Sequence, residues 1–268
     1  MLRLALGVLV AIVVSAPAVS AQSVVLEIRP RVGDTLSIRM DQLVEMTGTT
    51  RGDTARSHAM ETAVFTRAVA QRRLTDGTIV LGIADSVVMF PRVQGGAPRT
   101  QRLGGKSTQM LIQQNGAVDL LPNESNSEDL RELFGQLPAM MPDDPIVVRG
   151  KWTREMPVPL RGDIHGTGWV RTTFTFDSLS KSREIAYITL NGLLSHERPR
   201  DEAGERDANG TITGTIQLNR RLGWITDSKM TIVLESVVLN AAAGRKPNAS
   251  DRMKVRTKIV QRVRATAK

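Results

Sequence analysis

Apolar and polar residues alternate with a period of two along much of the chain after residue 22. In segments 36–46, 170–176 and 211–218, most of the residues at every second position are apolar and most of the intervening ones are polar. This alternation is typical of a β-strand that buries one face. The segments are also rich in Thr, Val and Ile, which suit a pleated surface. The pattern therefore predicts a chain made mainly of strands.

Three further segments, 77–90, 184–194 and 229–239, are more continuously apolar, which predicts strands buried on both faces. Turn signals separate the predicted strands. They are Asp76-Gly77, Asn191-Gly192, Asn209-Gly210 and the polar segment 198–210. We therefore expect a meander of long antiparallel strands.

One segment, 125–137, has the period of an amphipathic helix and is followed by Pro138. Its apolar stripe consists of Leu130, Leu133, Phe134 and Leu137. Such a stripe must lie on an apolar surface, and the concave side of a sheet offers one. The predicted fold is therefore mainly β (α+β): a long antiparallel curved sheet or half-open barrel with one central covering helix.

Residues 1–21 have the features of a signal peptide. A basic Arg3 precedes an apolar run, Leu4 to Val14, and Ala21 ends a stretch of small residues, so we expect cleavage before Gln22. The apolar run is too short to span a bilayer, which needs about 20 residues. We expect an exported protein, periplasmic or secreted. With no Cys in the chain, we expect neither a lipoprotein anchor nor a disulfide.

The mature chain divides into two β-rich halves around a connector. We expect a first β half in 22–120, a helix and Pro-rich connector in 121–150, and a second β half in 151–268, with 22–268 as one domain. Segments 72–88 and 220–238 share the words Arg-Arg-Leu, Thr-Asp, Ile-Val-Leu and Ser-Val-Val in that order. This similarity suggests an internal repeat, although β-rich chains also reuse such words by chance.

The midsection PDDPIVVRGKW, residues 142–152, resembles a segment found in a family of exported bacterial β-rich proteins of unknown function. The matching positions are Pro142, Pro145, Ile146, Gly150 and Trp152. The resemblance implies that the Trp opens the second β half, and it implies no activity. The layout is also similar to that of periplasmic lipoprotein-carrier proteins, whose curved sheet and covering helices hold an acyl chain.

Basic residues alternate along the C-terminal segment. They are Arg252, Lys254, Arg256, Lys258, Arg262 and Arg264. The full sequence carries a net charge of +9, and residues 252–268 contain no acid, so the rest of the mature chain is nearly neutral. One interpretation is an outward strand face whose charges prevent edge-to-edge aggregation. The other is a surface for an anionic partner, such as phospholipid head groups. Nucleic acid is disfavoured because no aromatic residues interleave with the charges.

Residue types that carry catalysis or bind metals are few and dispersed. The histidines, His58, His165 and His196, lie apart and without metal-site spacing, and no Gly-x-Ser-x-Gly motif is present. Segment 104–108, GGKST, lacks the first Gly of a phosphate-binding loop, so we interpret it as a Gly-rich turn. The acidic pair Asp143-Asp144 is interpreted as a solvated part of the connector. We expect no catalytic residue, no metal and no cofactor.

Methionine is common among the apolar residues and adapts to varied apolar ligands. Six methionines would line a cavity or, in the alternative, fill gaps in a core: Met40, Met46, Met60, Met89, Met140 and Met141. The predicted ligand-binding residues are Leu130, Leu133, Phe134, Leu137, Met140 and Met141.

Together these features predict a non-enzymatic exported envelope protein. It would bind an apolar, lipid-like ligand or an unknown protein partner, with the basic C-terminal strand facing an anionic surface. Two alternatives remain open: a structural or interaction module with a filled core and no ligand, and a hydrolase of unknown class.

Overall fold

The computed structural model describes residues 22–50, 56–91, 97–122, 139–159, 167–196, 208–239 and 252–268. These residues form strands, turns and extended segments, with no helix among them. The strands are β1 (Thr35–Thr50), β2 (Arg56–Arg73), β3 (Gly77–Pro91), β4 (Arg99–Gln113), β5 (Val118–Leu120), β6 (Lys151–Pro159), β7 (Thr167–Leu179), β8 (Ile185–His196), β9 (Ala208–Asn219), β10 (Trp224–Leu239) and β11 (Arg252–Ala267). The predicted signal peptide, 1–21, and the predicted helix, 125–137, lie outside the described residues.

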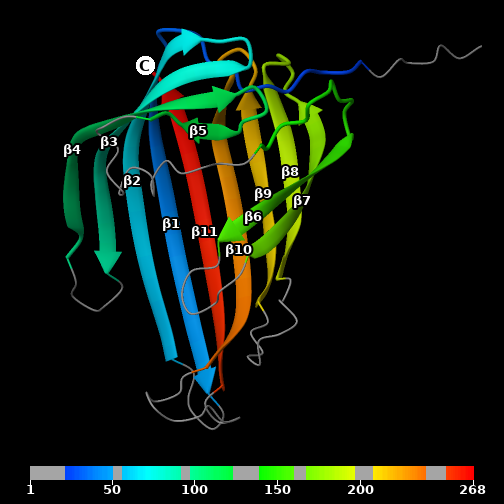
Figure 1. Cartoon of the computed structure of the whole chain (residues 1–268). Coiled ribbons are helices and arrows are strands. Elements are labelled where there is room, and N and C mark those ends of the chain that lie inside the picture. The colour runs from blue at the N-terminus through cyan, green and yellow to red at the C-terminus, as the bar shows by residue number, and fades with distance from the viewer. Residues whose placement is uncertain are drawn as a thin grey trace, which may run out of the picture.

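The strands form one antiparallel sheet in the order β5-β4-β3-β2-β1-β11-β10-β9-β8-β7-β6. The predicted curved antiparallel sheet is therefore confirmed, and it contains strands from both predicted halves. Figure 1 shows the sheet curling so that its two edge strands, β5 and β6, lie on the same side of the central strands. We call the end where β1 begins and β11 ends the upper end, and the opposite end the lower end.

The first and last strands lie at the centre of the sheet. β1 and β11 pair from Leu36–Ala267 at the upper end to Thr50–Met253 at the lower end. β10 pairs with the other side of β11. The interpretation of the basic segment as the protected edge of a sheet is therefore wrong, because both sides of β11 are already hydrogen-bonded to neighbouring strands.

The core lies on the concave face at the upper end. The extended segment 22–34 crosses this face and buries Val24, Leu26 and Ile28, which are 4%, 2% and 4% exposed. Its backbone N–H groups donate to carbonyl groups far apart in the sequence: that of Val24 to Ile146, and that of Ile28 to Gln114, each at 2.8 Å. Segment 22–34 thus joins the β4–β5 turn to the connector that precedes β6.

The segments predicted as strands lie in strands of the structure, apart from Glu184, but burial and turn positions differ from the prediction. β8 is not buried on both faces: Ile188 on the concave face is 1% exposed, whereas Leu193 on the convex face is 66% exposed. Asn191-Gly192 is not a turn but lies inside β8. Gly192 is required there because a Cβ would lie 2.4 Å from the Ile212 side chain and 2.7 Å from the Thr172 hydroxyl. Asn209-Gly210 similarly lies inside β9.

Other local predictions concern turns. Asp76-Gly77 follows β2 and begins β3, which confirms the predicted turn at this position. Segment 104–108 is not a turn between strands but lies inside β4, where Gly104 and Gly105 have φ angles of 67° and 70°. There the register with β3 shifts between Ala84 and Ser86, so the two glycines form a bulge. Within the described residues, no helix is long and apolar enough to be a membrane span.

Candidate functional site

The alternation predicted for the C-terminal segment is present in β11. Lys254, Arg256, Lys258, Arg262 and Arg264 are exposed, while the residues between them are half-buried or buried. We call these five residues the β11 basic row. They lie on the convex face, opposite the core. Arg252 begins β11, and its side chain lies outside the described part of the structure. Because β11 is central, the row is flanked by side chains of β1 and β10.

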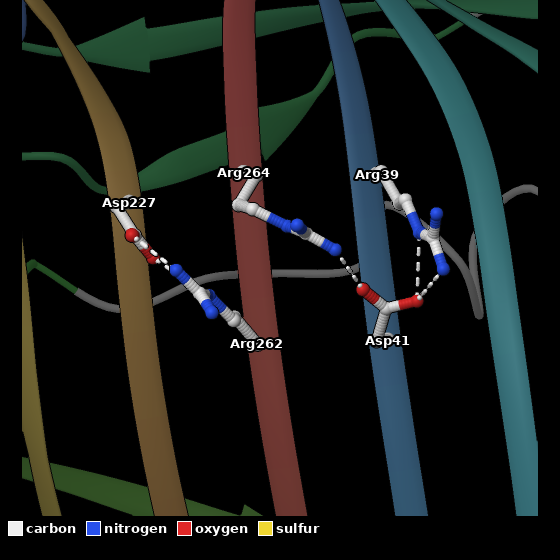
Figure 2. Close-up of polar contacts among 5 residues, drawn as sticks. All are labelled: Arg39, Asp41, Asp227, Arg262 and Arg264. Atoms are coloured by element: carbon white, nitrogen blue, oxygen red, sulfur yellow. Dashed lines mark hydrogen bonds and ion pairs between the residues drawn. The ribbon is translucent and has the colours of Figure 1, made fainter.

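Acidic residues on both neighbouring strands neutralise part of the β11 basic row (Figure 2). Arg264 donates to Asp41 of β1 at 2.7 Å, and Arg262 donates to both carboxylate oxygens of Asp227 of β10 at 2.8 and 3.3 Å. Lower along the strand, Lys258 lies 3.2 Å from Glu45 and Arg256 lies 3.7 Å from Glu235. The acids therefore alternate from one side of β11 to the other.

This arrangement offsets repulsion that the strand pairing itself creates. Arg39 and Arg264 are directly opposite each other on β1 and β11, and like charges in such a position are destabilising. Asp41 bonds to both: its distance to the Arg39 Nη2 is 2.7 Å, as is that to the Arg264 Nη2. Partial burial raises the pKa of Asp41, but the hydrogen bonds from Arg39 and Arg264 outweigh it and lower the pKa overall.

The lower part of the β11 basic row is less well neutralised. Lys254 lies opposite Thr49 of β1 and Val237 of β10, which carry no charge. Among the described residues Lys254 forms no ion pair. Lys254 thus keeps an unpaired positive charge at the lower end of the convex face, among the residues that the structure describes.

The concave face changes character from the upper to the lower end. At the upper end Met110 and Met141 are 5% and 0% exposed, so these methionines fill the core. At the lower end Met46, Met60 and Met89 are 43%, 44% and 37% exposed. The two interpretations of the methionines therefore apply to different parts of the same face.

The strand register places apolar side chains of five strands on the lower part of the concave face, although His58 and Thr257 lie on either side of Met46. Met60 lies opposite Val44, Val44 opposite Ile259, and Ile259 opposite Ile232, which makes one row across four strands. We call this surface the lower concave face. Its members on β1, β2, β3, β10 and β11 are Val44, Met46, Met60, Met89, Met230, Ile232, Leu234, Val255 and Ile259.

Of the predicted ligand-binding residues, the structure describes two. Met141 is fully buried in the upper core, and Met140 packs against that core. Leu130, Leu133, Phe134 and Leu137 lie outside the described residues. The structure thus adds the lower concave face, which the sequence indicated only through its scattered methionines.

The 142–152 segment has a structural role. The indole N–H of Trp152 donates to the Met140 carbonyl at 2.8 Å, and its ring stacks on Phe174 with centroids 5.3 Å apart. Arg154 donates to both carboxylate oxygens of Asp143, each at 2.9 Å. Its hydrogen bond lowers the pKa of Asp143. Asp143 therefore anchors the connector to β6. The sequence suggested only that this acid keeps the connector solvated.

The histidines are not brought together in the described part of the chain. His58 on β2 lies opposite Met46, and His196 ends β8 opposite Gly168 of β7. His165 lies outside the described residues. In the described ranges, no three His, Asp or Glu residues gather in an arrangement that would hold a metal ion.

The middle of the chain resembles a known protein family. Residues 101–225, from β4 to the start of β10, match the model of a family of unknown function (DUF6263). The matched range contains segment 142–152, which confirms the predicted resemblance to an uncharacterised β-rich family. No curated protein matches the chain.

Solved structures show only distant likeness. Pseudomonas aeruginosa OccK2 (OpdF) in complex with glucuronate aligns at 8% identity and a TM-score of 0.27, over 88% of this chain and 100% of that chain. The COG4313 outer membrane channel from Pseudomonas putida F1 aligns at 9% identity and a TM-score of 0.25, over 90% of this chain and 98% of that chain. At such TM-scores these likenesses carry no argument about the function of this chain.

Proposed function

We propose that the protein is an exported envelope protein that binds an apolar, lipid-like ligand on the lower concave face. The observation that carries the proposal is the exposure of Met46, Met60 and Met89 together on the lower concave face. A contiguous exposed apolar patch marks an interaction site. Methionine side chains are unbranched and polarisable, so they adapt to a flexible acyl chain.

Charge complementarity favours an amphiphile with an anionic head group over a neutral ligand. The lower ends of β2 and β4 carry exposed basic residues beside the apolar surface, Arg56 and Arg99. By strand register Arg56 and Arg99 lie on the concave face, level with Gly48 and Met89. We further propose that the convex β11 basic row rests on an anionic surface, as phospholipid head groups provide.

The upper half of the concave face is a filled core, as the structural alternative predicts. That alternative explains Met110 and Met141 but not the lower concave face, because half-exposed methionines contribute little to packing. Envelope location rests on the predicted signal peptide, 1–21.

The binding experiment uses the mature chain, 22–268, and parinaric acid, a fluorescent fatty acid, as the probe. Substitution of Met46 and Met60 by Gln keeps the side-chain length and makes the surface polar. Full burial of a Met side chain contributes about 1.5–3 kcal/mol, and roughly half of that remains to be gained here. The loss at two positions, about 1.5–3 kcal/mol in total, weakens binding by about 10- to 150-fold.

The matched control is Leu193→Gln, which removes an apolar side chain that is 66% exposed on the convex face. This variant keeps wild-type affinity for parinaric acid if the concave face is the site. Equal weakening by Leu193→Gln, or no saturable binding to the wild-type chain, would overturn the proposal. Native mass spectrometry of the chain purified without detergent adds an independent readout, since a bound lipid appears as extra mass that solvent extraction removes.

A further inference from the structure

A pocket of about 470 Å³ lies on the convex face at the upper end, between β1, β2 and β11. Its lining carries four cationic side chains and one carboxylate, that of Asp85. The cations are Arg39, Arg67, Arg264 and Lys268. The sheet separates this pocket from the lower concave face, so the two surfaces are distinct.

Four side chains form a rectangle in this pocket. Arg39 lies directly opposite Arg264, and two residues further up Ser37 lies directly opposite Thr266. Directly opposite side chains are about 5 Å apart and positions two residues apart on a strand are separated by about 7 Å. Two arginines and two hydroxyl-bearing residues therefore line one pocket on the convex face.

The donors of this rectangle are only partly used. Asp41 accepts from Nε and Nη2 of Arg39 and from Nη2 of Arg264. Nη1 of Arg39, and Nε and Nη1 of Arg264, donate to no other described residue. The hydroxyls of Ser37 and Thr266 also form no hydrogen bond with a described residue. The two arginine side chains are 49% and 45% exposed, so solutes reach them.

The surroundings hold the arginines in place and keep the pocket positive. The Arg39 guanidinium lies over the Phe65 ring, 5.4 Å from its centroid, and Asp41 bridges Arg39 to Arg264 as Figure 2 shows. The one lining carboxylate, Asp85, is engaged by Arg67 at 2.7 and 2.9 Å. With Asp41 counted as well, the cations still outnumber the carboxylates.

We propose that this pocket binds a phosphate group, as inorganic phosphate or as a phosphate monoester, between Arg39, Arg264, Ser37 and Thr266. Guanidinium groups match phosphate oxygens in paired hydrogen bonds. A tetrahedral phosphate has acceptor oxygens for all four donors, whereas a planar carboxylate offers only two. The pocket is larger than a phosphate ion needs, which leaves room for the ester substituent.

The test is isothermal titration calorimetry of the mature chain with inorganic phosphate, at constant ionic strength. The expected result is saturable binding at one site. Arg264→Gln weakens it by about tenfold, the effect of one charge-assisted hydrogen bond. Thr266→Val tests the site without a change of charge and also weakens binding. Circular dichroism and urea denaturation verify that each variant is folded.

The matched control is Lys151→Gln, which removes one exposed positive charge from the edge strand β6, away from β1 and β11 in the sheet order. It leaves phosphate affinity within about twofold, because charges so far apart on the surface are screened by salt. If Arg264→Gln and Lys151→Gln weaken binding equally, a general positive field is responsible and the pocket proposal fails. Absence of saturable phosphate binding overturns it as well.

A second arm distinguishes a lipid head group from a soluble phosphate. Phosphatidylcholine vesicles are prepared with phosphatidic acid, a phosphate monoester, or with phosphatidylglycerol, a diester. Preference for phosphatidic acid that is lost in Arg264→Gln and competed by inorganic phosphate supports a lipid source. Phosphate binding without vesicle binding supports a soluble source. Neither outcome depends on the parinaric acid experiment, so the two proposals fail separately.

Discussion

Truncation of Leu26 to Ala tests how the upper end of the sheet is held. Leu26 is 2% exposed, in the segment that crosses the concave face between Val24 and Ile28. The substitution removes three carbon atoms, and at about 0.8 kcal/mol for each buried methylene the transfer term is roughly 2.4 kcal/mol. The cavity left behind adds to this, so we expect a loss of about 3 kcal/mol in the free energy of unfolding.

The measurement is urea denaturation of the mature chain followed by circular dichroism. For a chain of this size a loss of 3 kcal/mol also lowers the melting temperature by about 6–12 °C. The control is Val25→Ala, one residue away, where the side chain is 51% exposed and we expect less than about 0.5 kcal/mol. Equal, small effects of the two substitutions would refute the packing of this segment into the core.

Two other predictions concern the sheet itself. The hydrogen bond from Arg67 lowers the pKa of Asp85 below its ordinary value, so the folded state gains stability from the carboxylate at neutral pH and loses it as the pH falls below about 4. In the Asp85→Asn variant, the urea concentration at the unfolding midpoint should therefore fall less steeply as the pH decreases below about 4. The difference should be small, because the ion pair is partly exposed. An unchanged pH dependence would contradict the pairing of Asp85 with Arg67. Gly192→Ala should cost about 1–3 kcal/mol in urea denaturation, because the added Cβ meets the Ile212 side chain at 2.4 Å and the Thr172 hydroxyl at 2.7 Å; a neutral result would mean that β7, β8 and β9 pack less closely.

Some of the candidate sites were visible from the sequence and others were not. The alternation of β11 identified Arg262 and Arg264 as members of one exposed face. The acids that pair with them, Asp41 and Asp227, are some 220 and 35 residues away along the chain. The acids in β1 and β10 could have indicated these ion pairs, but only if it had been known that those strands lie beside β11.

The methionines were also only partly predictable from the sequence. Their abundance indicated an adaptable apolar surface, and Met46 and Met60 lie on one. The same reasoning placed Met141 beside them, whereas it is fully buried in the upper core. Composition cannot distinguish a methionine that fills a core from one on an open surface, because that difference depends on what packs against it.

By itself the sequence determined the local structure: strands of period two, the turn at Asp76-Gly77, and the two unlike faces of β11. These follow from the backbone geometry of a strand, in which successive side chains point to opposite faces. Only the tertiary structure decided which strands are neighbours. The pairing of β1 with β11 made the basic strand central, brought Asp41 between Arg39 and Arg264, and set Ser37 opposite Thr266. Such contacts depend on how the whole apolar surface is buried, which no local pattern encodes.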